Sequence, residues 1–150
     1  MGQKVNPVGF RTGIMTGWKS RWYASKKEFS ELLVEDKKIR TFIKTRNEAG
    51  GKPMYPAISK IEIERTRDEV KVILFSARPG ILVGQKGKGR RVEDLQNDLQ
   101  NLIGRRISIR IEEISRPAVV AQLVAEDIAE RLGKRASFRR TMKLALDEAM

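Results

Sequence analysis

Arg78-Pro79-Gly80-Ile81-Leu82-Val83-Gly84-Gln85-Lys86-Gly87 is the most informative stretch of this sequence, because it places a glycine-rich loop between an apolar run and an amphipathic pattern. Gly84 and Gly87 lack the Cβ atoms that keep a phosphate backbone at a distance. The helix predicted next offers unpaired N–H groups and a positive dipole end to an anion. Four cations beside that end add full charges: Lys86, Lys88, Arg90 and Arg91. We interpret this loop as a contact with a nucleic-acid backbone.

The residues around the loop predict an α+β fold. Residues 60–64 and 70–74 alternate apolar and polar side chains, which is typical of two strands joined by the polar turn 66–69. Residues 92–103 carry an apolar helical stripe that Gly104 ends, and residues 107–111 alternate again as a third strand. The sequence therefore predicts a three-stranded sheet with helices packed on it.

Further helices are predicted before and after this unit. Between residues 27 and 46 we predict one or two basic amphipathic helices whose apolar stripe comprises Phe29, Leu32, Leu33, Ile39, Phe42 and Ile43. Pro117 fits the first turn of a later helix that Gly133 closes. The buried stripe predicted for that helix is Val120, Leu123, Val124, Ile128 and Leu132.

The first 25 residues are predicted to form a basic arm. Their glycines and Pro7 disfavour a regular helix. Aromatic residues alternate there with cations: Phe10, Trp18, Trp22 and Tyr23 with Lys4, Arg11, Lys19 and Arg21. Such rings stack on bases or pack the arm onto the fold, and we expect at least one Trp to pack.

The composition favours a polyanionic partner. The 150 residues hold 31 Lys and Arg against 19 Asp and Glu, a formal net charge of +12, and residues 1–46 alone carry +7. A sequence without Cys or His provides no disulfide, no thiolate or imidazole for catalysis and no Cys/His zinc site. We expect no metal, no cofactor, no small-molecule substrate and no membrane contact, and a protein that is soluble and not secreted.

Three separated motifs resemble known families. The run 78–87 resembles the loop of a type-two KH domain, in which a GxxG loop clamps a nucleic-acid backbone. The opening Met1-Gly2-Gln3-Lys4-Val5-Asn6-Pro7-Val8-Gly9-Phe10-Arg11 and the later Phe138-Arg139-Arg140-Thr141-Met142-Lys143 resemble the small-subunit ribosomal protein three family of bacteria and organelles.

This resemblance implies a structural protein that binds rRNA in the head of the small ribosomal subunit and lies near the channel through which mRNA enters. Its partners would be small-subunit rRNA, mRNA and neighbouring small-subunit ribosomal proteins, in a bacterial cytoplasmic ribosome or an organellar one. The implied rRNA contacts are Gly84, Gln85, Lys86 and Gly87, with Lys4, Arg11 and Lys19 in the arm. Arg139, Arg140 and Lys143 would face mRNA, and their helical spacing independently places them on one face.

The expected organisation has three parts. Residues 1–25 form the arm, residues 26–116 the KH-like RNA-binding domain with its preceding helix, and residues 117–150 the helices that begin a second domain, which is expected to be absent or truncated. Members of the resembled family carry an α/β domain after a helix corresponding to the one that begins near Ala136. The loop also departs from the family pattern, because Lys88-Gly89-Arg90-Arg91 adds about two residues before Val92.

Two other classes of protein are alternatives to this interpretation. A nucleotide-hydrolysing P-loop enzyme is disfavoured, because Arg90 and Arg91 stand where the motif requires Lys and then Ser or Thr. Adjacent carboxylates at 112–113 and 126–127 point apart, so we predict surface charge and no catalytic residue. A free-standing KH regulator of single-stranded nucleic acid stays the alternative, although it would not need the aromatic basic arm.

Overall fold

A small mixed sheet forms the centre of the fold. The computed structural model describes residues 2–45, 57–83 and 91–150. Within these ranges the strands are β1 (Ser20–Arg21), β2 (Ile58–Arg65), β3 (Glu69–Ser76) and β4 (Arg106–Glu113), hydrogen-bonded in the order β1-β2-β3-β4. β2 and β3 are an antiparallel hairpin, β1 runs parallel to β2, and β4 runs parallel to β3. The three predicted strands are confirmed, and the arm adds β1 as a fourth.

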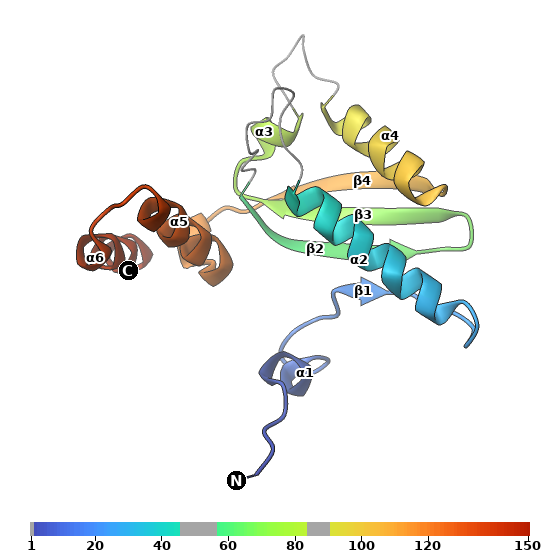
Figure 1. The fold of residues 1–150 in the computed structure, drawn as a ribbon, viewed down its shortest axis with the longest axis horizontal. Coiled ribbons are helices and arrows are strands. Elements are labelled where there is room, and N and C mark those ends of the chain that lie inside the picture. The colour runs from blue at the N-terminus through green and yellow to red at the C-terminus, as the bar shows by residue number, and fades with distance from the viewer. Residues whose placement is uncertain (1, 46–56, 84–90) are drawn as a thin grey trace.

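Two helices, α2 (Phe29–Thr45) and α4 (Arg91–Ile103), cross the same face of the sheet (Figure 1). A parallel β3–β4 pair needs a crossover connection, and the chain provides it through α3 (Pro79–Val83) and α4. The buried core lies between the helices and the sheet and comprises Ile39, Ile43, Ile58, Ile61, Ile63, Val70, Val72, Leu74, Leu82, Leu95, Leu99 and Ile107. The α+β prediction is confirmed.

The alternation read from the sequence explains this burial. In β3 every second residue is buried, from Val70 to Ser76, as expected for a strand with one face on the core. Gly104 follows α4 with a φ of +74°, and its N–H donates to the carbonyl of Gln100 at 2.7 Å. The predicted helix stop is therefore confirmed, although Leu102, predicted on the buried stripe, is 45% exposed.

Two predictions for the amino-terminal part were wrong. The arm contains a regular helix, α1 (Pro7–Arg11), because the Asn6 side chain accepts hydrogen bonds from the N–H groups of Val8 and Gly9 and thereby caps it. The stripe predicted for α2 is wrong at two members, because Phe29 and Leu33 are exposed, and it missed Asp36, which is buried. Its members Ile39 and Ile43 are buried, as predicted.

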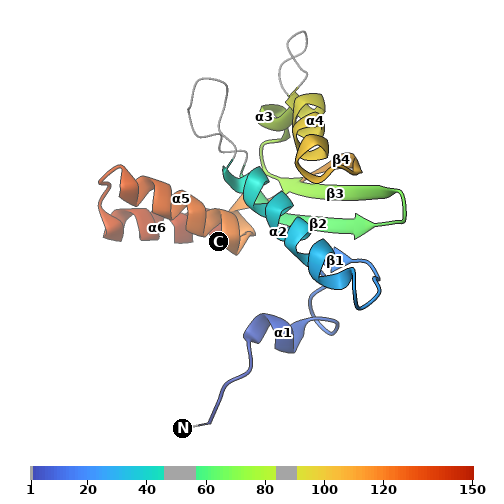
Figure 2. The ribbon, with the colours of Figure 1, turned by 45° about the vertical axis from the view of Figure 1, so that its right-hand side comes forward.

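The carboxyl-terminal part is a helical hairpin beside the sheet (Figure 2). It comprises the 3₁₀ turn η1 (Pro117–Val119), α5 (Ala121–Gly133) and α6 (Phe138–Ala149). Pro117 begins the 3₁₀ turn and not the α-helix, which corrects the prediction. Of the buried stripe predicted for α5, Leu123 is the buried member, and Leu132 is exposed. In the ranges described above, no helix combines the length and apolarity needed to cross a membrane.

Candidate nucleic-acid interface

A large groove separates the arm from the body of the fold. We call it the arm groove; its volume is about 1270 Å³. One wall is the arm between Pro7 and Ser20, and the other is formed by the carboxyl-terminal half of α2, the start of β2 and the first residues of α5. Because this volume exceeds that of ordinary small-molecule pockets, about 300–1,000 Å³, the groove suits an extended ligand.

The lining of the arm groove is strongly cationic. Its charged residues are Arg11 and Lys19 from the arm, Arg40 and Lys44 from α2, and Lys60 from β2, and none of the described lining residues is acidic. Lys60 forms an ion pair with Glu62 and lies 5.8 Å from the centre of the Phe75 ring. Arg11, Lys19 and Lys44 have no carboxylate within ion-pair distance among the described residues. Such a surface attracts a polyanion.

An exposed aromatic ring accompanies these cations. Trp18 lines the groove, immediately before Lys19, and is 60% exposed. Aromatic rings beside cations are the stacking platforms on which proteins hold the bases of single strands. Trp22 has the other role that was predicted for the arm's aromatic residues. It is half-buried, and its ring packs against Phe29 with 5.3 Å between ring centres.

The buried carboxylate of Asp36 ties the arm to the body of the fold. Its Oδ2 accepts hydrogen bonds from Ser20 Oγ and from Trp22 Nε1, each at 2.9 Å. Its Oδ1 accepts two from Arg65, at 2.8 Å from Nε and 2.6 Å from Nη2. We call Ser20, Trp22, Asp36 and Arg65 the arm clamp. It joins three segments, namely the arm, α2 and β2.

Arg40 holds the neighbouring part of the arm. Its guanidinium donates to the carbonyl of Ile61 at 2.5 Å, and at 2.8 Å both to the carbonyl of Lys19 and to Ser20 Oγ. Burial lowers the pKa of Arg40 from its ordinary value, and the Asp36 carboxylate opposes this shift. Because Arg40 is bonded to the Lys19 backbone, it fixes the position from which the Lys19 side chain reaches into the groove.

The predicted RNA contacts are only partly brought together. Arg11 and Lys19 line the arm groove, whereas Lys4 is exposed and is not part of its lining. The glycine-loop residues Gly84, Gln85, Lys86, Gly87, Lys88 and Arg90 lie outside the described residues. Arg91 is the first residue of α4.

The three cations predicted to face mRNA lie on α6, away from the arm groove. Arg139, Arg140 and Lys143 are all exposed and none of them lines the groove. The Arg139 guanidinium lies 5.6 Å from the centre of the Phe138 ring. Across the part of the chain that the structure covers, none of the three is ion-paired.

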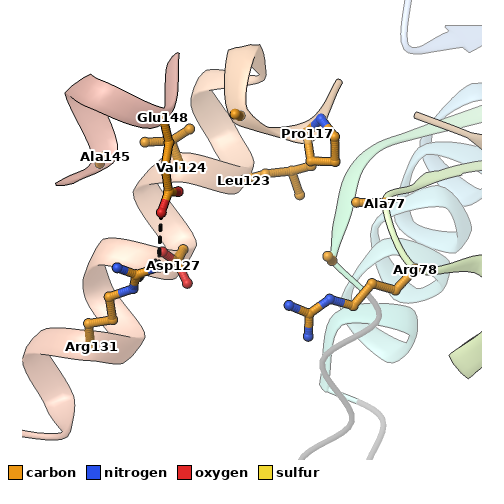
Figure 3. A pocket seen from close by; sticks show the side chains of 11 residues that line it. Ala77, Arg78, Pro117, Leu123, Val124, Asp127, Arg131, Ala145 and Glu148 are labelled. Atoms are coloured by element: carbon orange, nitrogen blue, oxygen red, sulfur yellow. Dashed lines mark ion pairs between the residues drawn. The ribbon is translucent and has the colours of Figure 1, made fainter. Parts of the chain in front are cut away.

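A second hollow lies between the α5–α6 hairpin and the end of β3 (Figure 3). Its volume is about 390 Å³ and its lining mixes both signs of charge. Arg131 lies 2.8 Å from the carboxylate of Asp127 and 4.0 Å from that of Glu148. Because its carboxylates lie within ion-pair distance of one of its cations, this hollow is a poorer polyanion site than the arm groove.

Sequence reasoning did not select Arg40, Lys44 and Lys60 as site residues. Arg40 and Lys44 were recognised only as the basic side of an amphipathic helix, and Lys60 as the polar face of a strand. Arg40 and Lys44 are four residues apart on α2, and this spacing could have indicated that they share a face of the helix. The arm that completes the groove lies about twenty residues or more away from Arg40 and Lys60 in the chain, and no local pattern reports such a contact.

Comparisons with known proteins agree with this architecture. A model of the KH domain family matches residues 38–118, which run from α2 through β4 and include the glycine loop. All 150 residues are similar to proteins named small ribosomal subunit protein uS3, with 58% identity in Rhodopirellula baltica, 49% in Desulforudis audaxviator and, over 151 aligned positions, 45% in Clostridium botulinum. The chain spans 62%, 65% and 64% of these relatives' lengths, respectively. Since the family model covers more than half of the sequence and the fold agrees with it, the chain belongs to the KH domain family.

Proposed function

We propose that this protein is a structural constituent of the small ribosomal subunit, where it holds rRNA in the subunit head near the channel through which mRNA enters. The observation that carries this proposal is the arm groove, which gathers several cations and an exposed Trp with no described acidic residue in its lining. The similarity of the whole chain to small-subunit proteins supports the assignment to a ribosome. These relatives are bacterial, which favours a bacterial ribosome.

In this proposal rRNA contacts the protein at two surfaces. Arg11, Lys19 and Lys44 neutralise phosphates in the arm groove, and the glycine loop 84–87 receives a second part of the backbone. Contacts of this kind position an RNA and do not read its sequence. The protein therefore acts as a scaffold for folded rRNA, without a reaction, cofactor or small-molecule substrate of its own.

The division of the chain follows the same proposal. Residues 1–25 form the arm, residues 26–116 the KH-like domain, and residues 117–150 the beginning of a further helical unit. The exposed cations of α6, Arg139, Arg140 and Lys143, face incoming mRNA. Neighbouring ribosomal proteins of the small subunit complete the set of partners.

Sedimentation of the tagged chain with ribosomal subunits tests this function. We expect the chain to migrate with small subunits at low salt and to be released progressively as salt rises, because its contacts are mainly ionic. A chain that stays at the top of the gradient, yet binds single-stranded RNA in isolation, would be a free-standing KH regulator. A chain that binds neither subunits nor RNA would contradict both functions.

A further inference from the structure

The Asp36 carboxylate divides its two oxygens between two tasks. Oδ1 accepts hydrogen bonds from Arg65 of β2, and this pairing helps to hold α2 on the sheet. Among the described residues, Oδ2 accepts hydrogen bonds only from Ser20 and Trp22 of the arm. Asp36 is 3% exposed, so these bonds are made away from water, where losing one costs most. The arm is therefore bonded to Oδ2 of a buried carboxylate, whereas β2 is bonded to Oδ1 of the same group.

The neighbouring carboxylate, Glu35, also lies on α2 but pairs only with residues of the body of the fold among those described. Glu35 pairs with Arg65 at 2.7 Å and with Arg105 at 3.4 Å, and among the described residues it forms no hydrogen bond or ion pair with the arm. The two adjacent carboxylates thus share Arg65, but only Asp36 is hydrogen-bonded to Ser20 and Trp22 among the described residues. Replacing each carboxylate in turn therefore distinguishes an effect on the fold from an effect on the position of the arm.

We propose that Asp36 is the positioning residue of the arm groove, which holds the arm wall in place before RNA arrives; this inference rests on the proposed function. Arg65 fixes Asp36, Asp36 fixes Ser20 and Trp22, and Arg40 fixes the Lys19 carbonyl beside them. The cations Arg11 and Lys19 on the arm then face Lys44 and Lys60 on the body across a preformed groove. A preformed site binds more tightly, because no binding free energy is lost to ordering the arm.

Asp36→Asn and its matched control Glu35→Gln test the proposal in the full chain. Either orientation of an Asn amide places an NH₂ group, which cannot accept, against donors of the clamp. Binding to a single-stranded oligouridylate of about ten nucleotides is measured by fluorescence anisotropy over a range of salt. We expect Asp36→Asn to weaken binding about tenfold and to flatten the salt dependence by about two phosphate contacts, those of Arg11 and Lys19. Glu35→Gln should change neither quantity.

A second variant keeps the test decisive if Asp36→Asn does not fold. The pair Ser20→Ala and Trp22→Phe removes the arm's two donors to Asp36, and leaves Asp36 bonded to Arg65 and an aromatic ring beside Phe29. Arg40 loses its bond to the Ser20 hydroxyl but keeps those to the carbonyls of Lys19 and Ile61. Combined with Arg11→Ala and Lys19→Ala it forms a double-mutant cycle. We expect the arm cations to matter much less in the clamp-deficient background. Strict additivity, or equal effects of Asp36→Asn and Glu35→Gln, would overturn the inference. Failure of the unmodified chain to bind RNA would instead overturn the proposed function.

Discussion

Gly104 and Gly133 stand at the ends of two helices but have different backbone conformations. Gly104 has a φ of +74°, whereas Gly133 is the last residue of α5 and has no positive φ. A Cβ at either position meets no atom within 4 Å, so conformation alone decides the effect of a side chain. We expect Gly104→Ala to lower the free energy of unfolding by about 1–2 kcal/mol.

Gly133→Ala is the matched control for this prediction. Alanine suits a helical position and restricts the unfolded chain, so the free energy of unfolding should stay equal or rise by about 0.5–1 kcal/mol. Urea denaturation of the two variants measures both changes. Equal stability of the two variants would show that the left-handed backbone at Gly104 is not what requires glycine there.

The burial of Asp36 is the residue-scale feature that the sequence did not reveal. Gly104 was predictable because its role is local, at the end of an apolar stripe. Asp36 lies among polar neighbours on α2, and its partner Arg65 is 29 residues away. A carboxylate is almost never fully buried without partners, so its burial follows only from the tertiary pairing. The same pairing explains why the buried line of α2 includes position 36 in place of Leu33.

Charge reversal within the arm groove tests its role at single residues. We expect Lys19→Glu with Lys44→Glu to weaken binding of single-stranded RNA at least tenfold and to flatten its salt dependence, by about 0.7 in the logarithmic slope for each lost phosphate contact. Lys37→Glu with Lys38→Glu changes the net charge equally, at exposed residues of α2 outside the groove lining. Anisotropy titrations should show a clearly smaller loss for this control. If both pairs weaken binding alike, only net charge matters and the groove is not the site.

At the scale of elements, long-period patterns were predictable and short capped segments were not. The hairpin of β2 and β3 and the strand β4 follow from alternation at residues 60–64, 70–74 and 107–111, and α4 follows from a helical stripe over residues 92–103. α1 and α3 have five residues each, too few for a periodic signal, and α1 depends on the Asn6 cap. β1 has two residues, and only its pairing with β2 defines it.

The glycine loop is the element whose proposed role rests on the sequence. We predict that Gln85→Asp with Lys86→Asp weakens RNA binding strongly, because two carboxylates would repel the phosphates nearest to the chain. Filter binding at physiological salt measures the change. Glu93→Gln with Asp94→Gln, in the first turn of α4, serves as the opposite control, since removal of acidic groups beside the loop should not weaken binding. Affinity that Gln85→Asp and Lys86→Asp leave unchanged would remove the loop from the proposed site.

At the scale of the whole molecule, cationic surfaces occur in separate places. The arm groove lies between the arm and the body, whereas the α6 cations lie on a hairpin beside the sheet (Figure 1). The net charge favours a polyanionic partner, but it could not predict the position of the arm, since the groove is lined by residues from four segments of the chain. The uneven charge of residues 1–46 pointed to the end of the sequence that forms one wall of the arm groove.

This separation allows the two RNA contacts proposed for the molecule to be distinguished. Arg139, Arg140 and Lys143 are exposed and do not line the arm groove, so their replacement by Ala should leave the fold and the affinity for rRNA unchanged. If they face mRNA, small subunits reconstituted with the triple variant should bind or retain mRNA less well, by about threefold to tenfold, since each lost surface charge near a phosphate weakens the ionic attraction modestly. Reconstitution followed by mRNA filter binding measures both steps in one preparation. Loss of incorporation into subunits would reassign this face of α6 to rRNA, and full mRNA binding would leave it without the proposed role.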